Sequence, residues 1–243
     1  MSGKVTVDML TRGWEAQPTE QLARWLLGKI FLRRITEGWI GGVIVETEAY
    51  LSSGDPACHA ARGPTNRNRT MFGPPGHLYV YSIHAKWCAN VVTEPIHHGA
   101  AVLLRAIEPV WGQAQMRVAR GVEDERNLTR GPARLCQALQ LDQRHNGVCC
   151  VTGVTGEEPG EVAIAQLNGF TSDWEVAAGP RIGISAGAEL PLRFFVRGNR
   201  FVSGRAADHG ARPVGRLFAG PEQPPLGELD GKPIRNRHAA SRR

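Results

Sequence analysis

One arginine inside an apolar segment places the strongest constraint on how this chain folds. Residues 100–107, AAVLLRAI, are too apolar to lie on a surface and predict a central β-strand. Arg105 lies within this segment, and an unpaired buried cation is costly. Arg105 therefore needs a carboxylate partner, and either Glu46 or Glu48 fits. The charge of Arg105 would lower the pKa of that carboxyl group and hold it ionised, as a water-activating base requires. A purely structural ion pair explains the arginine equally well.

An acidic strand is predicted at residues 43–51, VIVETEAYL. Side chains alternate along a strand, so Glu46, Glu48 and Tyr50 are expected on one face. The plain alternative is the solvated side of an edge strand. The neighbourhood weakens that alternative, because the strand leads towards His59 and a cationic segment. A carboxylate beside a cationic groove suits the attack on a polyanionic substrate.

Positive charge is unevenly distributed along the chain. The 243 residues hold 29 Lys and Arg against 23 Asp and Glu, but residues 231–243 contain five of these cations and no acid. Residues 56–93 also lack any Asp or Glu. The cations of this second segment are Arg62, Arg67, Arg69 and Lys86. A local cationic segment attracts a polyanion even when the net charge of the body is small, although an ordinary loop with clustered cations remains open.

The only three tyrosines of the chain, Tyr50, Tyr79 and Tyr81, fall in the same region. Tyr79 and Tyr81 are two residues apart on a predicted strand and are expected to face the same side. Aromatic faces near cations suit stacking on exposed bases, which contributes roughly 1–3 kcal/mol per base. The alternative is that Tyr79 packs inward and only Tyr81, or neither, is available.

The pattern of elements predicts an α+β fold, with a single domain around an antiparallel sheet over residues 1–219. A helix is expected from Thr19, its N-cap, to just before Gly28. The predicted strands are 29–35, 39–50, 77–83, 100–107, 181–185 and 193–196, and the other predicted helices are 111–120 and 132–141. The basic, proline-rich residues 220–243 are expected to be disordered.

Several classes of protein are disfavoured by the composition. A chain that is 42% hydrophobic at this length buries a core without disulfides or metals. Five cysteines without CxxC spacing predict reduced thiols, and no HxxxH or HExxH pattern occurs, so neither a metal nor a cofactor is expected. No apolar run reaches the roughly 18–20 residues of a membrane span and no targeting signal is found, so we expect the protein in the cytoplasm, or in the nucleus of a eukaryote. We also expect a monomer.

Five segments, read together and in order, resemble one family. They are ETEAY (46–50), TNRNRTMFGPPGHLYVY (65–81), VLLRAIEP (102–109), RGPARLCQAL (130–139) and PLRFFVRG (191–198). They resemble the alkyladenine, or 3-methyladenine, DNA glycosylases of the mammalian type over about residues 17–203. The resemblance implies a curved antiparallel sheet and a monofunctional enzyme that flips a damaged purine out of double-stranded DNA and hydrolyses its N-glycosidic bond.

The resemblance also implies roles for individual residues. Glu48 is similar to the general base of the family and Arg105 to its partner in holding the water. Tyr50 is expected on one side of the flipped base. The other implied contacts are His59 and Tyr81 on the opposite side of the base, Asn90 against the purine 2-amino group, and Met71 on DNA near the lesion. The cations Arg67 and Arg69 are expected to bind DNA.

One departure from the family affects the residue that wedges into the gap left by the flipped nucleotide. The interval from Tyr81 to Asn90 is one residue short, so either Ile83 or His84 is the wedge. An apolar isoleucine would unstack bases sterically, whereas a histidine can stack and become protonated.

Two competing functions stay open at this point. A non-catalytic relative would bind damaged nucleic acid without cutting it, and a small nucleoside hydrolase would use Glu46 and Glu48 as a carboxylate pair. Glu48 together with Arg105 favours the glycosylase over the first, and the cationic segment disfavours the second, since a free nucleoside offers no phosphate.

Overall fold

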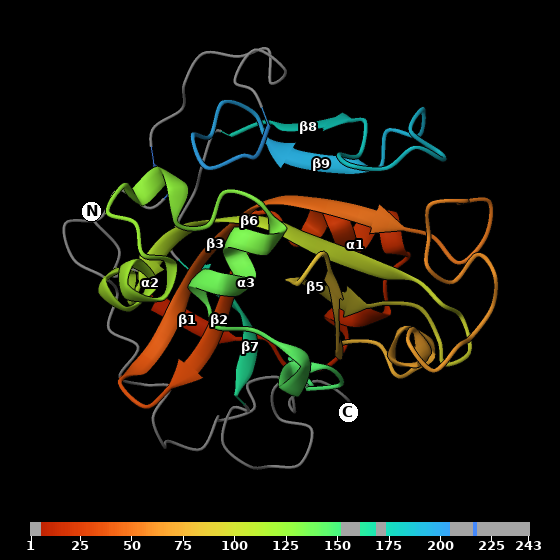
Figure 1. Ribbon diagram of the computed structural model, residues 1–243, viewed down its shortest axis with the longest axis horizontal. Coiled ribbons are helices and arrows are strands. Elements are labelled where there is room, and N and C mark those ends of the chain that lie inside the picture. Colours follow the sequence, from red (N-terminus) through yellow and green to blue (C-terminus); the bar gives the residue numbers. More distant parts are fainter. Residues whose placement is uncertain (1–5, 152–160, 169–173, 205–215, 218–243) are drawn as a thin grey trace, which may run out of the picture.

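The described part of the chain folds around one large antiparallel sheet with short helices on both faces (Figure 1). The computed structural model describes residues 6–151, 161–168, 174–204 and 216–217. Along the sheet the strand order is β1-β7-β2-β3-β6-β5-β4, and β9 pairs with β3 on one side and β8 on the other. The prediction of an α+β domain with an antiparallel sheet is confirmed. The predicted disordered segment 220–243 lies outside the described residues.

The strands are β1 (Thr6–Met9), β2 (Ile30–Ile35), β3 (Gly38–Tyr50), β4 (Leu78–Ile83), β5 (Lys86–Val92), β6 (Ala101–Trp111), β7 (Val162–Asn168), β8 (Val176–Gly179) and β9 (Arg193–Val196). The α-helices are α1 (Thr19–Trp25), α2 (Gln113–Arg120) and α3 (Pro132–Ala138). Short 3-10 helices are η1 (Trp14–Ala16), η2 (Arg69–Phe72), η3 (Glu125–Asn127) and η4 (Gln143–His145).

The acidic strand β3 lies in the interior of the sheet. It pairs with β2 through its first half, with β6 from Gly41 onward, and with β9 through Glu46 to Glu48. Glu46 and Glu48 are both 0% exposed. The alternative of a solvated edge strand is therefore wrong, because β9 covers the segment that an edge strand would leave open.

Strand β6 confirms the prediction made from its apolar sequence. All eleven of its residues are buried, and Arg105 lies among them. The register of β6 against β3 shifts on both sides of Glu46, which marks a β-bulge or irregularity there. A bulge re-aims side chains locally, so the partners of the two glutamates are set by this irregular pairing.

The predicted helices exist, with corrections at their ends. Thr19 is the first residue of α1 and not its N-cap, because its hydroxyl bonds to Thr93 and Glu94 instead of to the helix. Helix α2 ends at Arg120 and is capped by Gly121, which has φ 64°, as expected, but it begins at Gln113 and not at the predicted residue 111, because Trp111 is the last residue of β6. Helix α3 begins with Pro132 as expected but ends at Ala138, short of the predicted end at residue 141. Figure 1 shows α1 and α3 on opposite faces of the sheet.

One predicted strand is wrong. Residues 181–185 form no strand, and β9 pairs with β3 and with β8, which ends before Pro180. Proline has no backbone N–H to continue the ladder, and the next residue, Arg181, turns inward to Asp55. None of the described helices is long and apolar enough to cross a membrane. All five cysteines are free thiols, as expected.

The close approach of the β3 and β6 backbones at Gly42 allows a test of the packing between these two strands. A Cβ atom added at Gly42 of β3 would lie 1.9 Å from the carbonyl oxygen of Glu108 on β6. Gly42→Ala is therefore expected to lower the free energy of unfolding by at least about 2 kcal/mol, measured by urea denaturation. Gly179→Ala on β8 is the control, since its Cβ would meet only a ring carbon of Phe195 at 3.8 Å. Equal stability of the two variants would contradict the close approach of β3 and β6.

Candidate active site

The centre of the site is an arginine held between two carboxylates. Arg105 Nε donates to Glu46 Oε1 at 3.0 Å, and Arg105 Nη1 lies 3.0 Å from Glu48 Oε1. Antiparallel pairing of β3 with β6 brings the three side chains together, and all three are buried. Both carboxylates that the sequence offers as partners of Arg105 therefore contact it.

The two carboxylates differ in their affinity for a proton. Burial would raise the pKa of Glu46, but Arg105, Arg193 and the backbone N–H of Ser203 outweigh it and hold that pKa below its usual value. Burial raises the pKa of Glu48 above its usual value even though Arg105 opposes it. The expected lowering by Arg105 is thus present but is not the larger effect. Surroundings that separate the pKa values of two neighbouring acids in this way suit the two acids to different chemical roles.

Glu48 is also fixed by two hydrogen bonds of its own. The hydroxyl of Tyr50 donates to Glu48 Oε2 at 2.9 Å, and the backbone N–H of Ile182 donates to Glu48 Oε1 at 2.8 Å. A carboxylate that is buried, oriented and raised in pKa is a suitable general base near neutral pH. The predicted acidic face of β3 is therefore buried and is not a solvated surface.

The three tyrosines lie together, as the sequence predicts. They belong to one apolar cluster, separate from the main core, which contains Tyr50, Tyr79 and Tyr81. The rings of Tyr79 and Tyr81 stack with centroids 5.3 Å apart. Tyr79 is only 1% exposed, whereas Tyr81 is partly exposed. The alternative in which Tyr79 packs inward and only Tyr81 is available is the arrangement observed.

His59 and Asn90 flank this cluster. His59 Nδ1 lies 3.0 Å from the hydroxyl of Tyr79, and its ring meets Tyr81 edge-on with centroids 4.6 Å apart. Burial and then the charge of Arg67 lower the pKa of His59, which favours the neutral imidazole. Asn90 on β5 is buried opposite Tyr79 and donates from Nδ2 to its carbonyl oxygen at 2.9 Å.

The predicted DNA-contact residues are placed differently from one another. Met71 in η2 is 2% exposed and packs in the tyrosine cluster, so its contact with DNA stays a prediction. Arg67 and Arg69 are exposed, and Arg67 Nη2 donates to the carbonyl oxygen of Ser82 at 2.7 Å. That hydrogen bond connects the loop that contains Arg67 to the β4–β5 hairpin. Arg69 Nη2 donates to Asn66 Oδ1 at 2.6 Å.

Ile83 and His84 are both at the tip of the β4–β5 hairpin. Ile83 is 51% exposed and pairs with Lys86, and the two residues between them, His84 and Ala85, have φ of 48° and 58°. Positive φ at both central residues is typical of a type I′ hairpin turn, which usually contains Asn-Gly or Asp-Gly. The sequence lacks that signal, which explains why β5 was not predicted.

Sequence reasoning also missed a buried arginine beside Tyr50. Arg181 Nη1 and Nη2 donate to the two oxygens of Asp55, each at 2.6 Å, and both side chains are 0% exposed. The guanidinium carbon of Arg181 lies 4.7 Å from the centroid of the Tyr50 ring. Ile182, the donor to Glu48, is the next residue. Arg181 therefore links the Tyr50 ring to the loop that orients Glu48, and no local sequence signal announces it.

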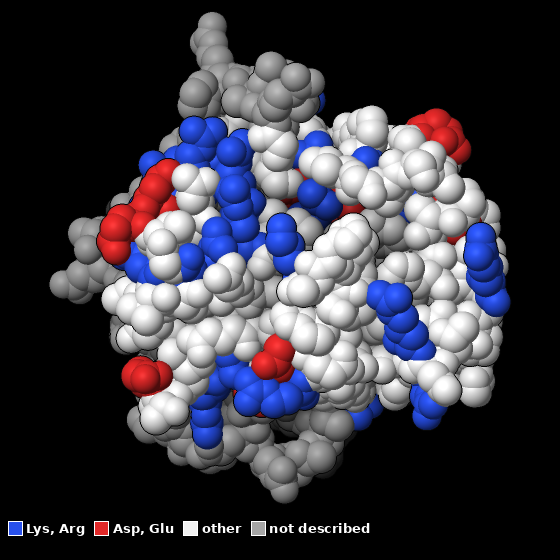
Figure 2. Space-filling view, viewed as in Figure 1, with Lys and Arg blue, Asp and Glu red and all other residues white. Residues whose placement is uncertain are grey.

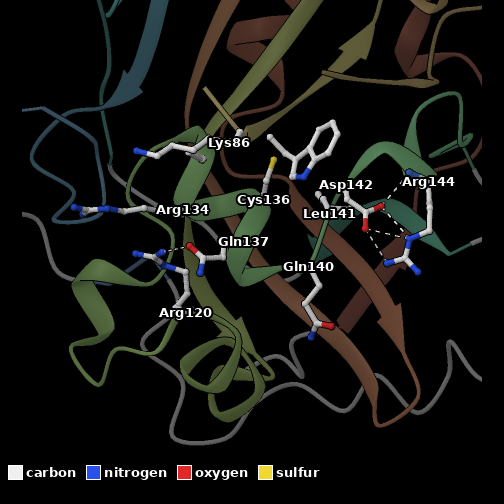
Figure 3. Close-up of a pocket in the computed structure, with 12 residues that line it drawn as sticks. Lys86, Arg120, Arg134, Cys136, Gln137, Gln140, Leu141, Asp142 and Arg144 are labelled. Atoms are coloured by element: carbon white, nitrogen blue, oxygen red, sulfur yellow. Dashed lines mark hydrogen bonds and ion pairs between the residues drawn. The ribbon is translucent and has the colours of Figure 1, made fainter. Parts of the chain in front are cut away.

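A basic groove lies beside the hairpin. Its volume is about 540 Å³, and it runs between the hairpin turn and α3 (Figure 3). Lys86, Arg120 and Arg134 extend to one side of it, while Arg144 lies at the other end, paired with Asp142. Figure 2 shows lysine and arginine side chains gathered over the part of this face around α2 and α3.

Apart from Arg144, which pairs with Asp142, the cations of this groove are not paired with an acid among the described residues. Within the described ranges no carboxylate forms an ion pair with Lys86, Arg120 or Arg134. Burial and then Arg134 lower the pKa of Arg120, and burial followed by Arg126 and Arg134 lowers that of Arg130. Cations that destabilise one another in this way favour an anionic ligand. Among the described residues no group of three or more His, Cys, Asp or Glu side chains is arranged to hold a metal ion.

Comparison with known proteins identifies the family. Residues 13–200 match the sequence model of the family described as Methylpurine-DNA glycosylase (MPG). The chain belongs to this family. A protein of Rhodopirellula baltica named "Putative 3-methyladenine DNA glycosylase" is 51% identical over 193 residues, which cover 77% of this chain and 80% of that protein. Proteins of the same name from Rhodopseudomonas palustris and Carboxydothermus hydrogenoformans are 43% and 41% identical over 196 residues, 80% of this chain in each case and 88% and 98% of the relatives.

The buried Arg181–Asp55 pair beside Tyr50 gives a test of the candidate site. Asp55→Asn leaves the charge of Arg181 buried without its counter-ion, so the free energy of unfolding is expected to fall by roughly 3 kcal/mol or more in urea denaturation. The matched control is Glu20→Gln, which breaks the exposed Arg24–Glu20 pair and is expected to change stability by less than about 1 kcal/mol. Similar losses in the two variants would show that the Arg181–Asp55 pair does not hold the loop.

Proposed function

We propose that this member of the family is a monofunctional DNA glycosylase that removes alkylated or deaminated purines from double-stranded DNA and starts base excision repair. It flips the damaged nucleotide out of the duplex and hydrolyses the N-glycosidic bond with an activated water. The observation that carries the proposal is the buried contact of Glu48 with Arg105 directly beside Tyr50. Family membership and the printed names of the relatives support the same activity.

In this proposal Glu48 is the base and Arg105 helps to hold the water. Glu48 removes a proton from the water as the bond to the purine breaks, and its charge stabilises the oxocarbenium character of the sugar. The raised pKa of Glu48 makes it a stronger base than an exposed carboxylate. An N-alkylated purine already carries a positive charge and leaves without a strong acid, whereas a neutral lesion such as hypoxanthine needs protonation by His59 or a water.

The proposed base pocket uses the tyrosine cluster. Tyr50 stacks on one side of the flipped purine, and His59 and Tyr81 contact the other side. These contacts offset the few kcal/mol of stacking and pairing that flipping costs. Asn90 crowds the purine 2-amino group, which disfavours normal guanine. The burial and hydrogen bonding of Asn90 support this role, since a fixed side chain excludes a group better than a mobile one.

The duplex is proposed to cross the β4–β5 hairpin, where Ile83 or His84 fills the gap left by the flipped base. Both are exposed at the tip, so the choice between them stays open. Arg67 and Arg69 would contact the backbone on one side of the hairpin, with Met71 near the lesion. The basic groove beside Lys86 would take the backbone further along the duplex. We propose action as a monomer in the cytoplasm, without a metal or other cofactor.

The role of Glu48 is tested by Glu48→Gln. The variant is expected to bind duplex DNA containing 1,N6-ethenoadenine or hypoxanthine but to release the base at least about 100-fold more slowly, because the water loses its general base. Single-turnover base release and fluorescence anisotropy measure the two properties. Glu108→Gln is the control, since Glu108 is a buried carboxylate on β6 that bonds Asn199 and Leu217 outside the site.

Two results would contradict the proposal. Release by Glu48→Gln at nearly the wild-type rate would remove Glu48 from its role. A wild-type protein that binds lesion DNA tightly but releases no base from any of 3-methyladenine, 7-methylguanine, hypoxanthine or ethenoadenine would favour the non-catalytic alternative.

The basic groove is tested by the salt dependence of binding. Each phosphate contact that is lost reduces the slope of log K against log salt by about 0.9. Arg134→Gln and Lys86→Gln are each expected to weaken binding to undamaged duplex DNA and to lower this slope by about one, measured by anisotropy between 50 and 200 mM salt. The control is Arg24→Gln on α1, which lies on the opposite face of the sheet and should leave the slope unchanged. Unchanged slopes in both groove variants would place the DNA elsewhere.

A further inference from the structure

We propose that Glu46 is a positioning residue for base release: together with Ser203 it holds the guanidinium of Arg105 in place, and its negative charge keeps Glu48 a strong base. The inference concerns a carboxylate that never touches the substrate, and it rests on the proposed function. The family match assigns no role to Glu46 or Ser203, and the sequence suggests Glu46 only as a partner of Arg105 or as one half of a carboxylate pair.

Glu46 is completely enclosed by hydrogen-bond donors. Its Oε1 accepts from Arg105 Nε at 3.0 Å, from Arg193 Nε at 2.7 Å and from the Ser203 hydroxyl at 2.9 Å. Its Oε2 accepts from the backbone N–H of Ser203 at 2.7 Å. The donors come from β6, β9 and the segment after β9, so the carboxylate is fixed from three directions.

The same contacts fix the plane of the Arg105 guanidinium. Its Nε bonds to Glu46 and its Nη2 donates to the Ser203 hydroxyl at 3.1 Å. Its Nη1 is the nitrogen that faces Glu48, at 3.0 Å. Because Glu46 and Ser203 hold Nε and Nη2, the guanidinium of Arg105 cannot rotate, and the orientation of its contact with Glu48 is fixed. A catalytic contact held by a rigid surrounding shell keeps its orientation when the substrate binds.

The charge of Glu46 acts on Glu48 in two ways. Arg105 is shared between the two carboxylates, so Glu48 receives only part of its stabilisation, and the nearby negative charge of Glu46 adds to the rise in the pKa of Glu48. The other groups that face Glu48 are Arg105 from β6, Tyr50 from β3, Arg181 from the loop after β8, Tyr81 from β4 and Cys88 from β5. The pKa values of both tyrosines and of Cys88 are raised, so they are neutral at pH 7. Glu46 is thus the one negative charge among these groups.

The test is the pH profile of single-turnover base release from lesion duplex. Glu46→Gln removes the negative charge but keeps an acceptor oxygen. The acid limb of the profile, where Glu48 becomes protonated, is expected to move to lower pH by about one unit, because Arg105 then stabilises the Glu48 carboxylate alone. The rate on the high-pH plateau is expected to fall about tenfold, since the base is weaker and the arginine less firmly held. Glu108→Gln, the matched buried carboxylate, should leave the limb in place.

Ser203→Ala separates position from charge. It removes a hydroxyl that bonds both Glu46 and Arg105 but changes no charge. The plateau rate is expected to fall severalfold while the acid limb stays at the wild-type pH and lesion-DNA binding is retained. A purely structural role for the cluster would lower stability in urea without changing the plateau rate of the folded protein.

If Glu46→Gln does not fold, a double variant allows the same test. The double variant Glu46→Gln/Arg193→Gln removes one charge of each sign, so the buried cluster keeps its balance, and the same shift of the acid limb is expected. A limb that stays in place in the folded variants, or an unchanged plateau in Ser203→Ala, would overturn the inference. Absence of base release by the wild-type protein would instead overturn the proposed function.

Discussion

The guanidinium of Arg105 lies inside the sheet between two carboxylates, and removing such a cation from water is costly unless its partners are already fixed. Strands β3 and β6 carry the three charged side chains, and β9 with the segment after it adds Arg193 and Ser203. The register of these strands is therefore tied to the ion pairs, since a shift by one residue would turn the charges to the other face. The same pairing that satisfies the buried arginine also builds the site.

The cluster gives two chemically similar acids different properties. Glu46 is surrounded by donors and held ionised, whereas Glu48 is buried with fewer of them and has a raised pKa. The residues that would read the substrate lie at the edge of this rigid centre: the tyrosines on β3 and β4, the hairpin tip and the basic groove. In the proposed function, bond cleavage takes place in the interior of the sheet and DNA recognition at strand ends and loops, where side chains reach solvent.

Patterns confined to a few residues were enough to predict much of this arrangement. The apolar run predicts β6, the alternation in ETEAY places Glu46, Glu48 and Tyr50 on one side, and the spacing of Tyr79 and Tyr81 puts their rings together. Contacts between distant segments were not predictable. Arg181 with Asp55, and Ser203 with Glu46, are more than 100 residues apart in sequence, and nothing in either segment specifies its partner. Strand β5 was missed because the left-handed backbone of the turn before it, at His84 and Ala85, is not encoded by glycine or asparagine.

The sequence by itself determined the family, through five motifs in order, and the class of fold, through local periodicity. It also predicted that Arg105 pairs with Glu46 or Glu48, because a buried cation needs a carboxylate. Only the tertiary structure decided how the two carboxylates differ, with the pKa of Glu46 lowered and that of Glu48 raised. That difference depends on the number of donors around each oxygen and on the depth of burial, which are set by β9, the loop after β8 and the segment around Ser203. A pKa is a property of the whole surroundings of a group, and those surroundings exist only after the chain has folded.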